Sequence, residues 1–226
     1  MTPYRHIFVI FGASPGPTAL ITRKGVRMEA MASAGNTVGI LLAAGAGSRF
    51  SGETHKLHAN IGGIRVWEHS LNELIAADIG PTIVVTGAVV LDLANYEVHE
   101  AHNHRWSEGQ STSLRAAIDV AGQYEPEAAI IGLADQPGIT TEAWIKLARS
   151  TATLATAIYD DVPGHPVRIA ASLWPELPES GDFGARALLR KYEDHVERIP
   201  CSGSAFDIDT TKDLDQWLKQ SPTSSP

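Results

Sequence analysis

Short apolar runs alternate along the chain with longer segments of helical periodicity, beginning near residue 37. Residues 38–44 form an uninterrupted apolar run, which is typical of a strand buried on both faces of a parallel sheet. Similar runs predict further strands over residues 82–86, 128–134, 154–159 and 167–170. Strands that alternate with helices indicate an α/β protein.

Apolar residues at three- and four-residue spacing predict the first clear helix. Trp67, Leu71, Leu74 and Ile75 follow this spacing between residues 66 and 77, so they are expected on one buried face. The pattern predicts further helices over residues 111–121, 141–149, 185–191 and 211–219. We therefore expect one Rossmann-like, three-layer domain, in which helices cover both faces of a mostly parallel sheet.

Two further expectations concern side chains within these helices. In the helix over residues 111–121, Leu114, Ala117 and Ile118 are expected to face inward, and Ser111 or Thr112 is expected to cap the N-terminus. Trp67 and Trp144 belong to helical stripes, so we place both in the core.

Length and composition fit a single globular domain. The chain has 226 residues, of which 43% are hydrophobic and 19% are charged. Its 18 basic and 26 acidic residues leave a formal charge of −8, which disfavours nucleic acid and anionic membranes as partners. Cys201 is the only cysteine, so an intrachain disulfide is excluded and a cytoplasmic location fits best.

The two ends of the chain depart from the regular pattern. We expect residues 37–220 to form the folded domain, with disordered extensions over residues 1–36 and 221–226. The apolar run at residues 6–11 is too short to span a bilayer, and the glycines and prolines of residues 12–17 interrupt it.

A glycine-rich loop follows the first strand. Gly45 and Gly47 leave room for backbone N–H groups to hold a phosphate. The loop lacks the Walker spacing, and Phe50 stands where a dinucleotide-binding fingerprint has its third glycine. A tight structural turn explains the glycines about equally well. Arg49 and Lys56, two cations beside the loop, favour a bound polyphosphate.

Acidic residues are expected at the same edge of the sheet. Asp135 directly follows the strand over residues 128–134, and ligands of open α/β sheets bind at this carboxyl edge. Taken singly, Asp135 is explained by a turn, and Asp207 and Asp209 by capping of the last helix. Together they would supply oxygen ligands for Mg²⁺, with a triphosphate completing its shell, and we assign Asp209 rather than Asp207.

Histidines provide weaker candidates. His102 and His104 would form a zinc pair only with a third ligand, and none has a convincing context, so we interpret them as surface residues. His165 lies between glycine and proline, and a functional site or a tight turn explains it equally well. Cys201 has no basic neighbour that would activate it as a nucleophile.

Six elements in the same order resemble the nucleotidyltransferases that attach a nucleotide to the molybdenum cofactor. They are AAGAGSRF at residues 43–50 with a following lysine, WSEGQSTSL at 106–114, LADQP at 133–137, GHPV at 164–167, GDFGAR at 181–186 and DIDT at 207–210. The resemblance extends over most of residues 38–218. The AAG and DQP forms resemble the cytidylyltransferase branch of that family more than the guanylyltransferase branch.

This resemblance implies a fold of the nucleotide-diphospho-sugar transferase type and a particular reaction. A phosphate of the acceptor would attack the α-phosphorus of a nucleoside triphosphate, CTP by this resemblance, and pyrophosphate would leave. The acceptor would be a molybdopterin-type cofactor and the metal cofactor would be Mg²⁺. A molybdoenzyme or its chaperone would be the protein partner.

The resemblance also assigns roles to single residues. Arg49, Lys56 and Asp135 would be catalytic, and Asp135 and Asp209 would hold the metal. His165 and Asp182 would bind the acceptor. The nucleotide would be bound by Ala43, Ala44, Gly45, Ala46, Gly47, Ser48, Gly109, Ser111 and Ser113. The segment from Arg49 to Lys56 is two residues longer than the family pattern, which leaves open whether Lys56 reaches the same phosphate.

Two other functions remain open at this point. One is an NTP-binding module or cofactor chaperone that binds the nucleotide without turnover. The other is an NAD-type oxidoreductase that uses the glycine loop, although the missing third glycine and the lack of a persuasive ribose-binding acid disfavour it.

Overall fold

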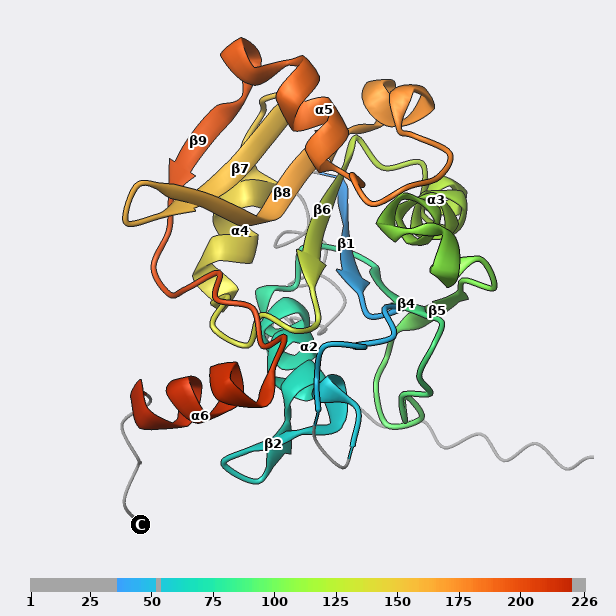
Figure 1. The fold of residues 1–226 in the computed structure, drawn as a ribbon. Helices are drawn as coiled ribbons and strands as arrows, with labels where there is room; N and C mark the ends of the chain where they lie inside the picture. The colour runs from blue at the N-terminus through green and yellow to red at the C-terminus, as the bar shows by residue number, and fades with distance from the viewer. Residues whose placement is uncertain (1–35, 52–53, 221–226) are drawn as a thin grey trace, which may run out of the picture.

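The structure is a computed structural model that describes residues 36–51 and 54–220 (Figure 1). The extensions expected over residues 1–36 and 221–226 lie outside the described residues except for Asn36, so they remain predictions. None of the described helices is long and apolar enough to cross a membrane.

A seven-stranded sheet with the order β5-β4-β1-β6-β8-β7-β9 forms the centre of the domain. Its strands are β1 Thr37–Leu42, β4 Thr82–Thr86, β5 His99–His102, β6 Ala128–Leu133, β7 Leu154–Tyr159, β8 Val162–Ala170 and β9 Glu197–Pro200. β8 runs antiparallel to both neighbours, and the other neighbouring pairs of this sheet are parallel. The prediction of a mostly parallel sheet in one α/β domain is confirmed.

Helices cover both faces of this sheet. The α-helices are α2 Val66–Ala77, α3 Gln110–Ala121, α4 Thr141–Arg149, α5 Arg186–Lys191 and α6 Thr211–Gln220. Shorter elements are a hairpin of β2 Asn60–Ile61 and β3 Ile64–Arg65, and the 3-10 helices η1 Lys56–His58, η2 Trp106–Glu108, η3 Gly122–Tyr124, η4 Ala171–Glu176 and η5 Glu193–His195. α2 and α4 pack on one face, and α3 and α5 pack on the other (Figure 1).

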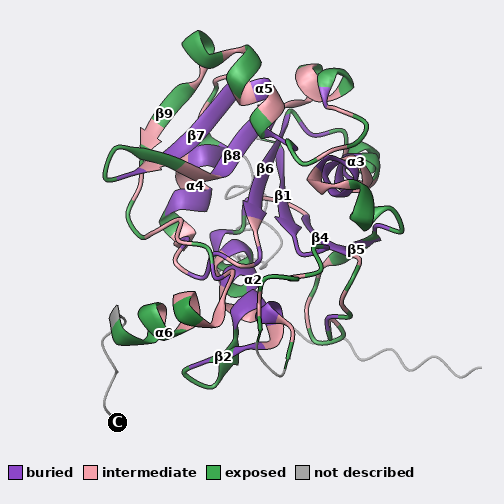
Figure 2. Ribbon diagram, viewed as in Figure 1, coloured by how far each residue is buried: buried purple, intermediate pink, exposed green. Residues whose placement is uncertain are grey.

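Each face of the sheet has its own hydrophobic core. Leu41 packs in one core with Trp67 and Trp144, whereas the adjacent Ile40 packs in the other with Leu114. Figure 2 shows β1, β6 and the inner faces of the helices buried between these layers. Because neighbouring residues of β1 point into opposite cores, the strand is apolar throughout. The core positions predicted for Trp67 and Trp144 are confirmed, but Ile75 is 38% exposed, so its predicted buried position at the edge of the α2 stripe is wrong.

The prediction that Ser111 or Thr112 caps α3 is wrong. Gly109 is the N-cap residue, and no side chain caps this helix end. Ser111 Oγ instead accepts a hydrogen bond from the backbone N–H of Gly184 at 3.1 Å, and Thr112 Oγ1 donates to the carbonyl of Gly109 at 2.8 Å. Both hydroxyls therefore form hydrogen bonds with backbone groups of other residues, and neither caps the helix. The predicted inward residues Leu114, Ala117 and Ile118 are buried.

The apolar pattern does not predict the edge strands β5 and β9. Only Ala101 is buried in β5, and no residue of β9 is buried. An edge strand pairs on one side only, so its polar side chains can remain exposed. β8 begins at Val162, before its predicted start at Val167, because the prolines and glycine in between resemble a loop.

Candidate functional site

A cavity of about 270 Å³ opens at the carboxyl end of β1. It is bounded by the glycine loop, by Lys56, by the start of α3, and by Asp135, Asp182 and Asp209. β1 lies between its parallel neighbours β4 and β6, so their carboxyl ends meet at this edge. The sheet thereby brings together segments that are far apart in the sequence.

Most of the predicted site residues line this cavity. They are Ala43, Ala44, Gly45, Gly47, Ser48, Arg49, Lys56, Gly109, Ser113, Asp135, Asp182 and Asp209. Ala46 is exposed on the same loop but is not part of the wall. Ser111 is buried beside the wall, and His165 lines a second cavity. Asp182 therefore lies with the nucleotide residues of the prediction rather than with His165.

The glycine loop presents unpaired backbone donors. The N–H groups of Gly45, Ala46, Gly47 and Ser48 donate no hydrogen bond to any residue that the structure describes. Gly47 has a φ of +59°, a left-handed conformation that favours glycine. At Gly45 an added Cβ would meet no atom within 4 Å, so the space beside it is open. A loop of this kind offers several N–H groups to an anion.

We expect alanine at Gly47 to lower the stability of the protein and alanine at Gly45 to weaken ligand binding. A Cβ at Gly47 would lie 2.7 Å from Nε2 of His55 on a left-handed backbone, so Gly47→Ala should lower the free energy of unfolding by about 1–2 kcal/mol. Gly45→Ala should keep the melting temperature but weaken NTP binding about tenfold, because the methyl group takes space next to the bound phosphate. Thermal melting and nucleotide titration test both variants. Equal destabilisation by the two substitutions would contradict this account of the loop.

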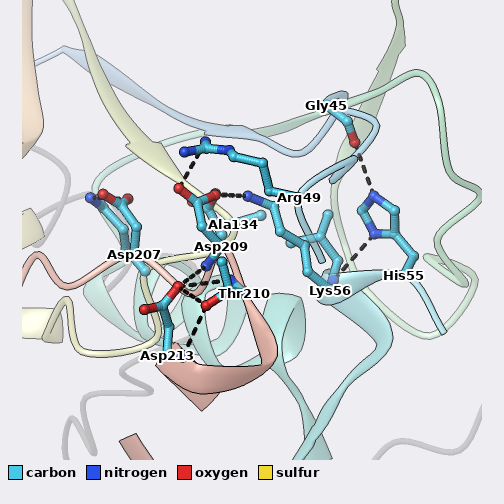
Figure 3. Close-up of polar contacts among 12 residues, drawn as sticks. Gly45, Arg49, His55, Lys56, Ala134, Asp207, Asp209, Thr210 and Asp213 are labelled. Carbon is cyan, nitrogen blue, oxygen red and sulfur yellow. Dashed lines mark hydrogen bonds and ion pairs between the residues drawn. The ribbon is translucent and has the colours of Figure 1, made fainter. Parts of the chain in front are cut away.

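Lys56 joins the acids from two distant segments. Its Nζ lies 2.5 Å from Oδ2 of Asp135 and 2.7 Å from Oδ1 of Asp209, and a guanidinium nitrogen of Arg49 lies 2.8 Å from Oδ2 of Asp209 (Figure 3). Burial lowers the pKa of Lys56, but the charges and hydrogen bonds of both carboxylates outweigh it and raise that pKa above its usual value. Lys56 therefore reaches the cavity despite the longer segment before it.

The start of α6 holds Asp209 in place. Oδ2 of Asp213 accepts hydrogen bonds from the backbone N–H groups of Thr210 at 2.7 Å and of Asp209 at 3.2 Å (Figure 3). The hydrogen bond from the Thr210 hydroxyl lowers the pKa of Asp213, which stays ionised as the cap. Ile208 is fully buried, and its N–H donates to the carbonyl of Asp135 at 2.9 Å. The two acid-bearing segments are thus tied together through their backbones.

Asp207 has different surroundings from Asp209. It lines the second cavity, and its Oδ1 accepts a hydrogen bond from Nε2 of Gln136 at 2.8 Å. Burial, and after it the charge of Asp135, raises the pKa of Asp207 to about 6. Asp209 rather than Asp207 shares Lys56 with Asp135. The assignment of the metal to Asp209 remains a prediction.

The acids fit a divalent cation that a ligand helps to hold. Oδ1 of Asp135 is buried and has no hydrogen-bond partner among the residues that the structure describes. A second carboxylate, that of Asp209, contacts the same Nζ of Lys56 as Asp135 does. No group of three or more His, Cys, Asp or Glu able to hold a metal occurs in the described parts of the chain. Since Mg²⁺ prefers six oxygen ligands, two carboxylates leave positions for water and for the oxygens of a bound ligand.

A second and larger cavity, of about 950 Å³, adjoins the first. Leu42, Gln110 and Leu133 line both cavities. The second one extends over β7, β8 and α5, and His165 and Arg186 lie in its wall. Burial, and after it the charge of Arg186, lowers the pKa of His165 to about 4, so this imidazole is neutral at pH 7. A neutral histidine can donate or accept a hydrogen bond there.

The sequence did not single out three residues of this region. His55 Nε2 lies 3.1 Å from the carbonyl oxygen of Gly45, while its Nδ1 accepts the N–H of Leu57 at 3.2 Å. Trp106 and Gln110 line the first cavity. Trp106 lies in an element that the resemblance identifies, but no spacing in the sequence indicates that the ring of His55 contacts the glycine loop.

Known proteins resemble this chain in sequence and in fold. The family described as MobA-like NTP transferase domain matches residues 39–196. No protein in a search of curated proteins matches the chain. Among solved structures, the homologue of Mycobacterium tuberculosis Rv0371c from Mycobacterium sp. strain JC1 is 25% identical, with a TM-score of 0.69 over 81% of this chain and 96% of that one.

Two further structures share the fold. The complex of Rv0371c with manganese, from Mycobacterium tuberculosis H37Rv, is 21% identical, with a TM-score of 0.66 over 82% of this chain and 100% of that one. The inositol-1-phosphate CTP transferase of T. maritima is 15% identical, with a TM-score of 0.61 over 85% of this chain and 98% of that one. The fold is that of the nucleotide-diphospho-sugar transferases, as expected. Since the matched region spans most of the described domain, the chain belongs to the MobA-like NTP transferase family and is a nucleotidyltransferase.

Proposed function

We propose that this nucleotidyltransferase transfers CMP from CTP to a phosphorylated acceptor of the molybdopterin type, with Mg²⁺ as its cofactor. The observation that supports this most directly is the single cavity in which the free N–H groups of the glycine loop face Lys56, Asp135 and Asp209. That cavity combines donors for a polyphosphate with carboxylates for a cation.

In the proposed reaction, an oxygen of the acceptor phosphate forms a bond to the α-phosphorus of CTP. The bond between that phosphorus and the oxygen bridging to the β-phosphate breaks, and pyrophosphate leaves with the electron pair. The loop from Gly45 to Ser48 holds the triphosphate, with Ala43 and Ala44 at its base. Gly109 and Ser113 border the nucleotide, and Ser111 fixes that wall through Gly184. Catalysis then consists of positioning and charge neutralisation.

Arg49 and Lys56 are the cationic groups of this mechanism. The side chain of Arg49 is 74% exposed, so it can turn from Asp209 to a phosphate with little loss of packing. Lys56 is only 11% exposed, and its Nζ lies between the carboxylates of Asp135 and Asp209 in the wall of the cavity. Asp135 and Asp209 would hold Mg²⁺, which supplies positive charge to the triphosphate and to the leaving pyrophosphate when it is bound.

The second cavity is the proposed acceptor site. It adjoins the nucleotide cavity at Leu42 and Gln110, so an acceptor phosphate can approach from that side. His165 and Arg186 line it, and Arg186 makes no ion pair with any described residue. Asp182 lies in the wall of the first cavity, and we propose that it contacts the acceptor where the two cavities meet. A cation without a partner favours an anionic ligand.

Arg186→Leu is expected to weaken acceptor binding selectively. Losing one charge-assisted hydrogen bond to a phosphate should raise KM for the acceptor about ten- to a hundredfold, while the Kd for CTP stays the same. Initial rates at varied acceptor and calorimetric CTP titration separate the two effects. Arg149→Leu, an exposed arginine on α4, is the matched control. A rise in the Kd for CTP equal to the rise in KM would contradict the assignment of this cavity.

The choice of CTP and of molybdopterin depends on the AAG and DQP forms at residues 43–45 and 135–137. A fold neighbour described as a CTP transferase supports the nucleotide, although its own acceptor is inositol 1-phosphate. We further infer that the product passes to a molybdoenzyme or its chaperone. Incubating the protein with each NTP, Mg²⁺ and molybdenum cofactor should release pyrophosphate fastest with CTP. Release that is fastest with another NTP would contradict the nucleotide assignment.

A further inference from the structure

Lys56 lies where the two carboxylates of the proposed metal site converge. Its Nζ contacts one oxygen of Asp135 at 2.5 Å and one oxygen of Asp209 at 2.7 Å. These are the two residues proposed to hold Mg²⁺. The ammonium group therefore competes for the same carboxylate oxygens that a metal ion would use.

The charges of this cluster balance before any ligand binds. Asp135 and Asp209 contribute two negative charges, and Lys56 and Arg49 contribute two positive charges. The side chains of Lys56 and Asp135 are 11% and 17% exposed, so solvent screens their interaction only partly. A divalent cation entering this arrangement would have to displace the ammonium group of Lys56 from the carboxylate oxygens or remain next to its like charge.

A nucleoside triphosphate changes both the charge and the number of ligands. The described chain brings no third carboxylate, histidine or thiol to Asp135 and Asp209, so the protein alone cannot complete the coordination shell. A triphosphate supplies oxygen ligands together with several negative charges. It also gives Lys56 a new partner, because the free N–H groups of the glycine loop line the same cavity.

We propose that Lys56 is a resident counter-ion that keeps divalent metal out of the nucleotide-free site, so that metal enters with the nucleotide. Binding of the triphosphate moves Lys56 from the carboxylates to a phosphate and frees oxygens of Asp135 and Asp209. This inference depends on the proposed metal site. It predicts that removing the positive charge of Lys56 improves metal binding in the nucleotide-free protein, although the same change harms turnover.

The test measures Mn²⁺ binding directly, by the loss of the free Mn²⁺ signal in electron paramagnetic resonance. In the nucleotide-free state, Lys56→Met should bind Mn²⁺ at least about tenfold more tightly than the unaltered protein, because a like charge next to the site is gone. Arg49→Met is the comparison, and it should change the affinity less, because Arg49 is 74% exposed and, among the described residues, forms an ion pair only with Asp209. The unaltered protein should gain a similar affinity when α,β-methylene-CTP is added, after subtraction of the Mn²⁺ that this analogue binds alone.

The measurement on the unaltered protein does not depend on whether Lys56→Met folds. Tight Mn²⁺ binding without the analogue, unchanged when it is added and lost in Asp135→Asn, would overturn the counter-ion role and leave the metal site standing. Absence of Mn²⁺ binding in every state and variant would overturn the metal site, and the inference with it. Tighter binding in Lys56→Met that persists in Lys56→Met/Asp209→Asn would place the ion elsewhere and also overturn the inference.

Discussion

Asp135→Asn is expected to turn over about a thousand times more slowly than the unaltered protein at saturating CTP, acceptor and Mg²⁺. The amide keeps the size of the side chain but removes the negative charge that pairs with Lys56 at 2.5 Å. It also replaces a buried, unpartnered oxygen that we assign to the metal. Continuous detection of pyrophosphate measures kcat, and Mn²⁺ binding shows whether metal affinity falls in parallel.

Asp119→Asn is the matched control for this substitution. Asp119 is an exposed residue of α3 and lines neither cavity, so its amide should leave kcat unchanged. Thermal melting of both variants separates loss of chemistry from loss of folded protein. A kcat for Asp135→Asn similar to that of the control would remove this residue from the catalytic site.

Lys56→Met is expected to lower kcat/KM for CTP by about a hundred- to a thousandfold, because it removes a preorganised cation from the reacting phosphates. The methionine retains an unbranched stem at this buried position, so the packing of the stem is largely kept. Because the same variant should bind Mn²⁺ more tightly without nucleotide, its metal affinity and its turnover should change in opposite directions.

Lys219→Met provides the control, since Lys219 is exposed on α6 and lines neither cavity. Initial rates at varied CTP, measured at saturating Mg²⁺ and acceptor, give kcat/KM for both variants. Unchanged kcat/KM in Lys56→Met would mean that Lys56 serves the fold alone, and that Arg49 and the loop suffice for the phosphates.

The bounds of elements with a clear apolar pattern could be predicted closely from the sequence. Strand β4 at residues 82–86 and helix α4 at residues 141–149 have the predicted bounds, because their apolar residues are set by the two cores. The predicted cap of α3 was wrong, because the Ser111 hydroxyl accepts a hydrogen bond from the N–H of Gly184, which is 73 residues away in the sequence. Tertiary partners of polar side chains are not encoded in local spacing.

The segments that form the site could be predicted from the sequence, but the contacts between their side chains could not. Parallel strands that end at one edge explain why Asp135 meets the glycine loop. The ion pairs of Lys56 were not predictable, because they depend on how the longer segment folds into η1. His55, directly before Lys56, begins this turn by accepting the N–H of Leu57 at its Nδ1.

Family membership decides between the functions that the sequence left open. A nucleotidyltransferase domain over residues 39–196 argues against an NAD-type oxidoreductase. A nucleotide-binding module without turnover differs from the proposed enzyme in one respect, because it forms no bond between the acceptor and the α-phosphorus.

That bond is tested most directly by following the α-phosphate of the nucleotide. The protein is incubated with molybdenum cofactor, Mg²⁺ and CTP labelled with ³²P at the α or the γ position, and acceptor and pyrophosphate are separated. Our account predicts α-label in the acceptor, γ-label in pyrophosphate, and about a thousandfold slower transfer of both labels with Asp135→Asn. The account is contradicted if the protein is folded and the label stays in the intact nucleotide, both with CTP and with every other NTP tried in turn.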